Sequence, residues 1–143
     1  RLYGARDLAS QVLTKERARW QAKIKLCETL EEGADNDHSG LPTQHLSQAI
    51  KEYEGLPSIV LTCGPEVMMM AVAKTCMDSG LQSSDIWMSV ERRMRCGVGL
   101  CGHCYVANSY ACKQGPAYRY DDYLSLKNKM VSTQQHQGAF QYC

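Results

Sequence analysis

The stretch CGVGLCGHCYVANSYAC, residues 96–112, decides most of what this sequence predicts, because it holds half of the chain's eight cysteines. They follow the spacing C-x4-C-x2-C-x7-C and are Cys96, Cys101, Cys104 and Cys112. Gly97, Gly99 and Gly102 lie between the first three, and glycine allows the positive φ angles that a backbone needs to wrap around a small inorganic group. The segment therefore predicts a metal-binding loop.

Two kinds of metal centre are compatible with four cysteines in this loop. The first three cysteines match the plant-type C-x4-C-x2-C…C arrangement that holds a [2Fe–2S] cluster. A structural zinc site usually pairs its ligands in two short knuckles, whereas only Cys101 and Cys104 form one here. The spacing favours iron–sulfur and leaves zinc as the alternative. With four cysteines present, His103 is expected to be exposed or to lie outside the ligand set, and Cys143 is expected to be inert.

The overall composition excludes several classes of function. Hydrophobic content of 44% and charged content of 22% are ordinary for a soluble globular protein. A net charge of +1 gives no support to a nucleic-acid partner held by phosphate contacts. No apolar run approaches the roughly 20 residues of a membrane span, and no apolar signal segment opens the chain. Cysteines with metal spacing favour a reduced compartment, so we expect a cytoplasmic protein.

The residues before the cysteine segment read as alternating strands and helices. Strands are expected at residues 2–3, 24–30, 58–62 and 86–90. Helices are expected after Asp7, after Thr43 and over residues 66–79, where Gly80 would follow as the left-handed residue beyond the end. Residues 31–42 read as an acidic loop. This alternation predicts an α/β fold with a mostly parallel sheet.

Three segments are expected along the chain: a nucleotide-fold part at residues 1–90, a cysteine-rich module at 91–124 and a weakly ordered polar tail at 125–143. The chain opens with Arg1 and with Leu2-Tyr3-Gly4, which reads like the end of a strand already under way. We therefore expect a piece of a longer subunit, the alternative being a processed or divergent short protein.

Two short motifs are weak signals for a nucleotide site. Cys63-Gly64-Pro65 ends a predicted strand and opens a helix, and ligands of open α/β sheets bind beyond the carboxyl ends of strands. The free N–H groups of such a helix start would suit a pyrophosphate, although a plain strand–helix turn is the simpler interpretation. Gly4-Ala5-Arg6 also follows a strand, so Arg6 could reach a ribose, a 2′-phosphate or only a surface carboxylate. The run 68–70, three methionines, is expected to pack in the core.

Charged and aromatic residues surround the cysteines. Arg92, Arg93 and Arg95 precede the first ligand, where positive charge would stabilise a reduced cluster and raise its potential. A solvated basic stretch or a partner-binding patch is an equal alternative. Tyr105 and Tyr118 are expected to be exposed beside this patch.

Taken together, four motifs resemble one family. They are LYGAR at residues 2–6, LTCGPEVMM at 61–69, MSVERRMRCGVGLCGHC at 88–104 and YACKQGP at 110–116. In this order they resemble the gamma subunits of sulfhydrogenase-type nickel–iron hydrogenases and the B subunit of anaerobic sulfite reductase. The electron-transfer subunit of dihydroorotate dehydrogenase B is a more distant relative, and all are similar to the ferredoxin–NADP reductase superfamily. The short gap before Cys112 fits the hydrogenase and sulfite reductase branches better.

The resemblance implies an electron relay between NAD(P)H, FAD, a [2Fe–2S] cluster and the redox centres of an iron–sulfur-bearing partner subunit. Flavin would convert two-electron hydride chemistry into one-electron steps. The four cysteines would ligate the cluster. Gly4, Ala5 and Arg6 would lie near the adenosine ribose, and Cys63, Gly64 and Pro65 near the nicotinamide and pyrophosphate.

This chain departs from the family pattern, because the flavin-binding barrel, the first strand and the glycine-rich phosphate loop are missing. The resemblance therefore implies only part of a ferredoxin-reductase-type nucleotide fold, which alone should bind neither FAD nor NAD(P) tightly. Two other functions stay open at this point: a zinc-stabilised interaction module and a free-standing ferredoxin-like carrier. Whether NAD or NADP is used, and the terminal acceptor, are not indicated by the sequence.

Overall fold

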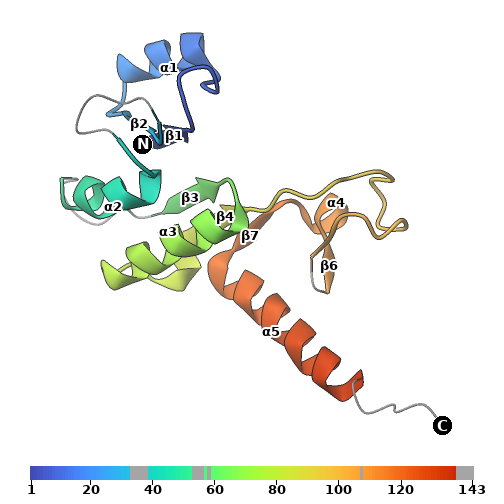
Figure 1. Cartoon of the computed structure of the whole chain (residues 1–143). Helices are drawn as coiled ribbons and strands as arrows, with labels where there is room; N and C mark the ends of the chain where they lie inside the picture. The colour runs from blue at the N-terminus through green and yellow to red at the C-terminus, as the bar shows by residue number, and fades with distance from the viewer. Residues whose placement is uncertain (33–38, 53–56, 58, 107, 138–143) are drawn as a thin grey trace. The chain divides into compact units, whose positions relative to one another are not determined.

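The computed structural model describes residues 1–32, 39–52, 57, 59–106 and 108–137, with side chains as far as residue 128. The chain divides into two compact units, Arg1–Gly55 and Leu56–Cys143, and Figure 1 labels their elements. Each unit is described by itself below. Within the described residues, no helix is both long enough and apolar enough to cross a membrane.

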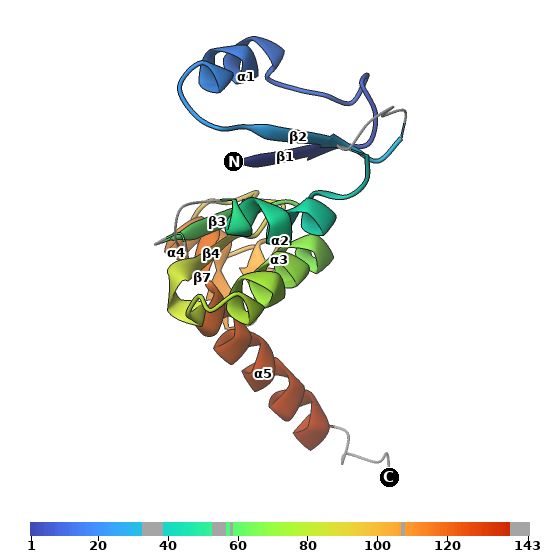
Figure 2. The same ribbon diagram turned by 90° about the vertical axis from the view of Figure 1, so that its left-hand side faces the viewer.

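The first unit is a short parallel α/β arrangement. Its elements are β1 (Leu2–Ala5), α1 (Thr14–Gln21), β2 (Cys27–Leu30) and α2 (Pro42–Lys51). Strands β1 and β2 pair in parallel from Leu2 opposite Cys27 to Ala5 opposite Leu30, and Figure 2 shows the two side by side. The expected strand–helix–strand order and parallel pairing are confirmed here.

Local details of this unit differ from the predictions. The prediction of a helix directly after Asp7 is wrong. The Asp7 carboxylate accepts a hydrogen bond from the Ser10 N–H at 2.7 Å, and residues 7–10 form a turn. An aspartate that bonds to nearby backbone offers the chain an alternative to helix. Helix α1 instead starts at Thr14, and α2 starts at Pro42 rather than after Thr43. The expected acidic loop at residues 31–42 lies partly outside the described residues.

Among the described residues of the first unit, the buried side chains are polar. Arg17 is 3% exposed. Its guanidinium lies 2.9 Å from Glu28, donates to Gln11 at 3.0 Å and sits 4.5 Å from the centre of the Tyr3 ring. Thr29 is fully buried, and its hydroxyl has no hydrogen-bond partner. Arg17 therefore ties the helix, the loop before it and both strands together.

Gly4 lies inside β1, which continues to Ala5. A Cβ at this position would collide with Cγ of Pro42 and lie 2.8 Å from its Cδ. Glycine is thus needed here because the start of α2 approaches the strand closely, as the α2–β1 contact requires.

The second unit is built on a three-stranded sheet. Its main elements are β3 (Val60–Cys63), α3 (Glu66–Asp78), η1 (Ser83–Asp85), β4 (Ile86–Ser89), β7 (Ala117–Arg119) and α5 (Tyr120–Gln137). The strand order is β3-β4-β7, with β3 and β4 parallel and β7 antiparallel to β4. Helix α3 connects the parallel pair and packs on it (Figure 1). The predicted helix at 66–79 and strand at 86–90 are confirmed, and Gly80 follows with φ 102°.

Apolar side chains of the sheet and of helices α3 and α5 form the core. The residues below 2% exposure include Met69, Ala73 and Cys76 of α3, and Ile86 and Met88 of β4. Met69 confirms that the methionine run contributes to packing. Tyr120 and Tyr123 of α5 are also buried, so the second unit holds an ordinary hydrophobic core.

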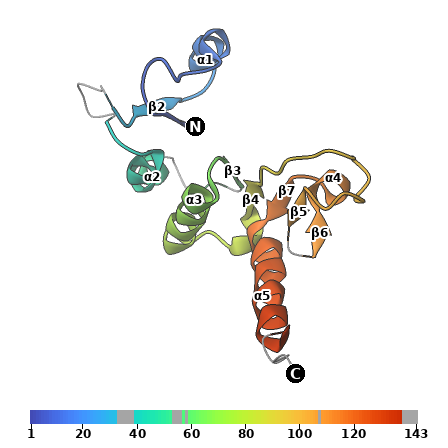
Figure 3. The same ribbon diagram turned by 45° about the vertical axis from the view of Figure 1, so that its right-hand side comes forward.

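The cysteine-rich segment leaves β4 and returns to β7. It contains β5 (Tyr105–Val106), β6 (Ser109–Tyr110) and the short helix α4 (Ala111–Gln114). Strands β5 and β6 form an antiparallel hairpin, which Figure 3 shows beside α4. The sequence prediction of a loop-rich module after residue 90 agrees with this arrangement.

The prediction of a weakly ordered tail is wrong up to Gln137. Helix α5 continues from Tyr120 to Gln137 and has Asp121 and Asp122 in its first turn. Acidic residues near a helix N-terminus are favourable, and no glycine or proline interrupts residues 120–137. Cys143 lies outside the described residues.

Candidate functional site

The backbone of the cysteine loop takes the conformation that its glycines were expected to supply. Gly97, Gly99 and Gly102 have φ angles of 72°, 76° and 75°. A Cβ added at Gly97 or Gly102 would meet nothing within 4 Å. Left-handed backbone, rather than lack of space, is therefore the reason for glycine at these two positions.

Backbone N–H groups of this loop point at a sulfur. The Leu100 N–H donates to Cys96 Sγ at 3.3 Å. Hydrogen bonds from the backbone of Val98 chiefly, and of Cys101 and Leu100, lower the pKa of Cys96 from its ordinary 9.0 to about 6. The loop thus stabilises the thiolate, which is the form that binds metal.

The thiols of the four cysteines interact with one another. The thiol of Cys101 hydrogen-bonds to Cys96. The thiol of Cys112 interacts likewise with Cys104, and this contact, with burial as a smaller cause, raises the pKa of Cys112. The charge of Cys96 also contributes to raising the pKa of Cys112, so the two sequence segments belong to one site.

The two sequence segments that carry the cysteines are held together by backbone contacts. The Ala111 N–H donates to the Cys104 carbonyl at 3.0 Å. The Gly99 N–H hydrogen-bonds to the Cys112 sulfur. Exposure falls from the exposed Cys101 through the half-buried Cys96 and Cys112 to Cys104, which is 1% exposed. One side of the site is therefore open to solvent and the other rests on protein.

The β5–β6 hairpin is anchored to the sheet by a buried hydrogen bond. Ser109 Oγ and Tyr118 Oη lie 2.9 Å apart, and both residues are 8% exposed. The prediction that Tyr118 is exposed is wrong. Its side chain is buried, and its hydroxyl forms a hydrogen bond with Ser109 of the hairpin. Tyr105 is exposed as predicted and stacks at a tilt on Tyr110, with 5.5 Å between ring centres.

His103 is exposed, as the sequence predicted, and Nδ1 of its ring lies 3.0 Å from the carbonyl oxygen of Cys101. This contact orients the imidazole ring toward the backbone between Cys101 and Cys104. The ring therefore stays outside the proposed set of four thiol ligands.

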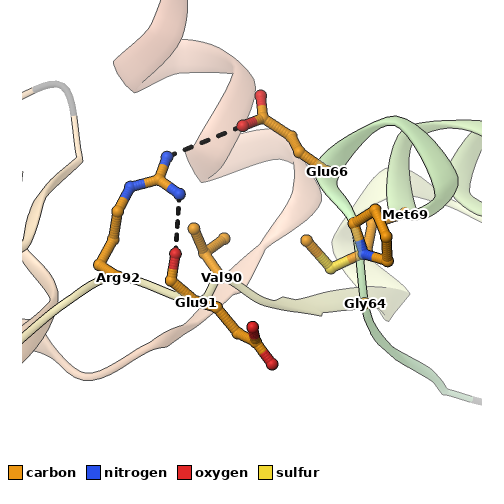
Figure 4. A pocket seen from close by; sticks show the side chains of 7 residues that line it. Gly64, Glu66, Met69, Val90, Glu91 and Arg92 are labelled. Carbon is orange, nitrogen blue, oxygen red and sulfur yellow. Dashed lines mark hydrogen bonds and ion pairs between the residues drawn. The ribbon is translucent and has the colours of Figure 1, made fainter. Parts of the chain in front are cut away.

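A cavity of about 340 Å³ lies where β3 and β4 end. Its walls are formed by Gly64, Pro65, Glu66, Met69, Val90, Glu91 and Arg92. Figure 4 shows these side chains at the start of α3 and along the segment that leads toward Cys96. The predicted motif Cys63-Gly64-Pro65 thus contributes two residues to a real cavity, and Cys63 beside them is exposed.

Glu66 is the centre of a charged network on one wall of this cavity. Its carboxylate accepts from Lys127 at 2.8 Å and from the Tyr123 hydroxyl, and lies 3.7 Å from Arg92. These contacts, Lys127 first, lower the pKa of Glu66. Burial and then the Glu66 carboxylate raise the pKa of Tyr123 to about 12. Arg92 also donates to the Glu91 carbonyl at 2.9 Å, so it joins the cysteine segment to the cavity wall.

The sequence did not indicate Glu66, Tyr123 or Lys127, because 61 positions separate Glu66 from Lys127 and no local pattern connects them.

Arg93 and Arg95 are exposed, whereas Arg92 is half-buried. Gly4, Ala5 and Arg6 belong to the first unit, where Arg6 is exposed at the end of β1. Their role at a ribose stays a prediction.

Comparisons with known proteins define the class. Residues 91–123 match the family described as the iron–sulfur cluster binding domain of dihydroorotate dehydrogenase B. A solved structure of the NADH-dependent reduced ferredoxin–NADP oxidoreductase, reported for flavin-based electron bifurcation, aligns with 95% of this chain and 51% of that chain. The TM-score is 0.59 at 22% identity. The chain thus has an α/β fold similar to that of the ferredoxin–NADP oxidoreductase, and its cysteine-rich segment is similar to an iron–sulfur cluster binding domain.

Particular relatives narrow this class. Sulfhydrogenase 2 subunit gamma of Pyrococcus furiosus is 47% identical over 54% of this chain and 28% of its own length. Sulfhydrogenase 1 subunit gamma of the same organism is 37% identical over 60% of this chain and 30% of its own length. The probable electron transfer subunit of dihydroorotate dehydrogenase B from Thermococcus kodakarensis is 32% identical over 61% of this chain and 34% of its own length.

These similarities confirm the resemblance to the sulfhydrogenase gamma subunits, to the electron transfer subunit of dihydroorotate dehydrogenase B and to the ferredoxin–NADP reductase fold; the resemblance to sulfite reductase stays a prediction. The higher identity to the sulfhydrogenase gamma subunits agrees with the spacing before Cys112. The chain spans about a third of the length of the relatives just named. The activity of a whole subunit is therefore a matter of proposal.

Proposed function

We propose that this chain is the iron–sulfur end of an electron-transfer subunit of an NAD(P)H-dependent flavin oxidoreductase. Its four cysteines, Cys96, Cys101, Cys104 and Cys112, would hold a [2Fe–2S] cluster. Such a cluster supplies one-electron transfer when bound. The complete subunit would carry FAD and pass electrons between NAD(P)H and a partner redox subunit, and we place the protein in the cytoplasm.

The conformation of the cysteine loop is the observation that carries this proposal. Four cysteines with C-x4-C-x2-C-x7-C spacing lie on a loop with three left-handed glycines and an N–H group that donates to Cys96. This donor set fits a two-iron cluster better than a single zinc ion. The match of residues 91–123 supports the same choice.

The cavity at the end of β3 and β4 is the candidate place for the nicotinamide end of NAD(P)H. Gly64 has φ 144°, and a Cβ there would lie 2.5 Å from Cε of Met68. Glycine therefore keeps the strand–helix turn open beside the cavity. Met69 and Val90 supply apolar walls for a ring, and Glu66 and Arg92 supply polar ones. Gly4, Ala5 and Arg6 are proposed for the adenosine ribose.

Metal analysis of the anaerobically purified, full-length protein tests the central point. About two irons and two acid-labile sulfides per chain, together with a [2Fe–2S] EPR signal after dithionite reduction, are expected. Stoichiometric zinc without iron would replace this proposal with a zinc-stabilised interaction module. Iron without any reduction of the cluster by NADH or NADPH would favour a free-standing carrier.

The open side of the cysteine loop is proposed to dock on the iron–sulfur-bearing partner subunit. Leu100 is 86% exposed, Val98 59% and Met94 46%, and Arg93 and Arg95 lie beside them in sequence. Apolar centres with charged rims are typical of binding surfaces, where rim charges mainly set the docking rate. Arg93→Glu should slow electron transfer to the partner more at low salt than at high salt. Unchanged rates at low salt would refute this role for the rim.

A further inference from the structure

Lys113 lies across the tip of the cysteine loop. It belongs to α4, directly after Cys112. A Cβ added at Gly99 would lie 2.7 Å from Cδ and 3.3 Å from Cγ of Lys113, with Cδ2 of Tyr110 at 3.6 Å. The aliphatic stem of Lys113 therefore occupies the space that a side chain at Gly99 would fill.

This contact covers the junction between the two cysteine-bearing segments. Gly99, in the first segment, donates its N–H to the sulfur of Cys112 in the second. The Lys113 stem lies against the same glycine. Long cationic side chains commonly cover a surface with their stem while the charged head stays in water. Because Nζ follows Cδ by only two bonds, the ammonium group of Lys113 lies near the tip of the cysteine loop.

The other basic residues near the site are placed differently. Arg92 is engaged by Glu66 and by the Glu91 carbonyl. Arg93 and Arg95 are exposed, and within the described residues the structure records no hydrogen bond or ion pair for either. Lys113 is thus the cation whose stem is fixed against the loop itself.

We infer that Lys113 tunes the reduction potential of the cluster and protects it, rather than the arginines that the sequence suggested. The inference rests on the proposed [2Fe–2S] function. One electron from the reduced flavin adds one negative charge to the cysteine site, and no bond in the protein forms or breaks. The ammonium group of Lys113 stabilises that added charge, and the stem limits access of water to Cys112.

The charge is tested with Lys113→Met, which keeps most of the stem and removes the ammonium group. Anaerobic dithionite titrations of the full-length protein, followed by EPR at low ionic strength, measure the midpoint potential. At a fixed solution potential, the ratio of reduced to oxidised cluster should fall about threefold. For a one-electron couple, a tenfold change in this ratio corresponds to about 59 mV. The potential should become more negative.

Arg93→Met is the matched control, because it removes one positive charge from an exposed side chain near Cys96. It should shift the potential by less than half as much. A Lys113→Met potential equal to wild type, or an equal shift in Arg93→Met, would overturn the inference. The stem is tested with Lys113→Ala, which should lose visible cluster absorbance in air faster than Lys113→Met. Equal rates of loss in the two variants would refute the protective part.

Different results would refute the proposed function and the role of Lys113. Wild-type protein without iron or without a [2Fe–2S] signal would refute the proposed function and with it this inference. Wild-type protein with a normal cluster, whose potential is indifferent to Lys113, would refute the inference alone.

Discussion

The buried hydrogen bond between Ser109 and Tyr118 gives a quantitative test of how the cysteine module is attached. Tyr118→Phe keeps the ring and its tilted contact with Tyr123, whose ring centre is 6.4 Å away. It removes only the hydroxyl that lies 2.9 Å from Ser109. The Ser109 hydroxyl is then left buried without a partner, which typically costs about 1–3 kcal/mol of the free energy of unfolding.

The partner variant completes a double-mutant cycle. Ser109→Ala leaves the Tyr118 hydroxyl unpaired in the same way, so it should cost a similar amount. The double variant leaves neither hydroxyl unpaired. Its loss in free energy of unfolding should therefore be about 1 kcal/mol smaller than the sum of the losses in the two single variants. Urea unfolding of the full-length protein under anaerobic conditions, followed by near-ultraviolet circular dichroism and cluster absorbance, measures all four free energies. Single costs that add to within about 0.3 kcal/mol would refute the bond as a stabilising contact.

Three further changes test other parts of the structure. Cys104→Ser removes the most buried thiol of the site and should abolish the [2Fe–2S] EPR signal, while Cys143→Ser should leave it unchanged; a normal signal in the first variant would exclude Cys104 as a ligand. Gly64→Val should abolish reduction of the flavin by NAD(P)H in the full-length protein and preserve the cluster spectrum, and normal NAD(P)H kinetics would contradict the nucleotide assignment. The pKa of Glu66 is lowered, mainly by Lys127, so its contribution to stability is complete above its ordinary value of 4.5 and is lost as pH falls below it. The stability difference between wild type and Glu66→Gln should therefore shrink as pH falls from 5 through the lowered pKa of Glu66, and a difference that stays constant on acidification would show that the contacts of the Glu66 carboxylate do not stabilise the fold.

Features set by neighbouring residues were predictable from the sequence. Helix α3 follows a proline and ends before Gly80, and both signals act within one or two residues of the helix ends. The parallel strands follow from the alternation of apolar runs with helices. The cysteine loop was predictable because ligand spacing and glycine positions are properties of one short segment.

Features that depend on distant contacts were not predictable. Tyr118 was expected at the surface, but its burial depends on a hairpin formed nine residues earlier in the chain. Asp7 could equally cap a helix or close a turn, and the outcome depends on which backbone N–H groups lie nearby. Lys113 was overlooked because nothing in the sequence says that its stem covers Gly99.

The polar interior of the first unit has a consequence for motion. All buried apolar residues whose side chains are described belong to the second unit, whereas Arg17 and Thr29 are what the first unit buries. Hydrophobic burial is the main source of resistance to local opening. In a hydrogen-exchange experiment, the amides of β1 and β2 should exchange by sub-global opening well before those of β4. The first unit would thus open before the second, whose sheet keeps its protection longest.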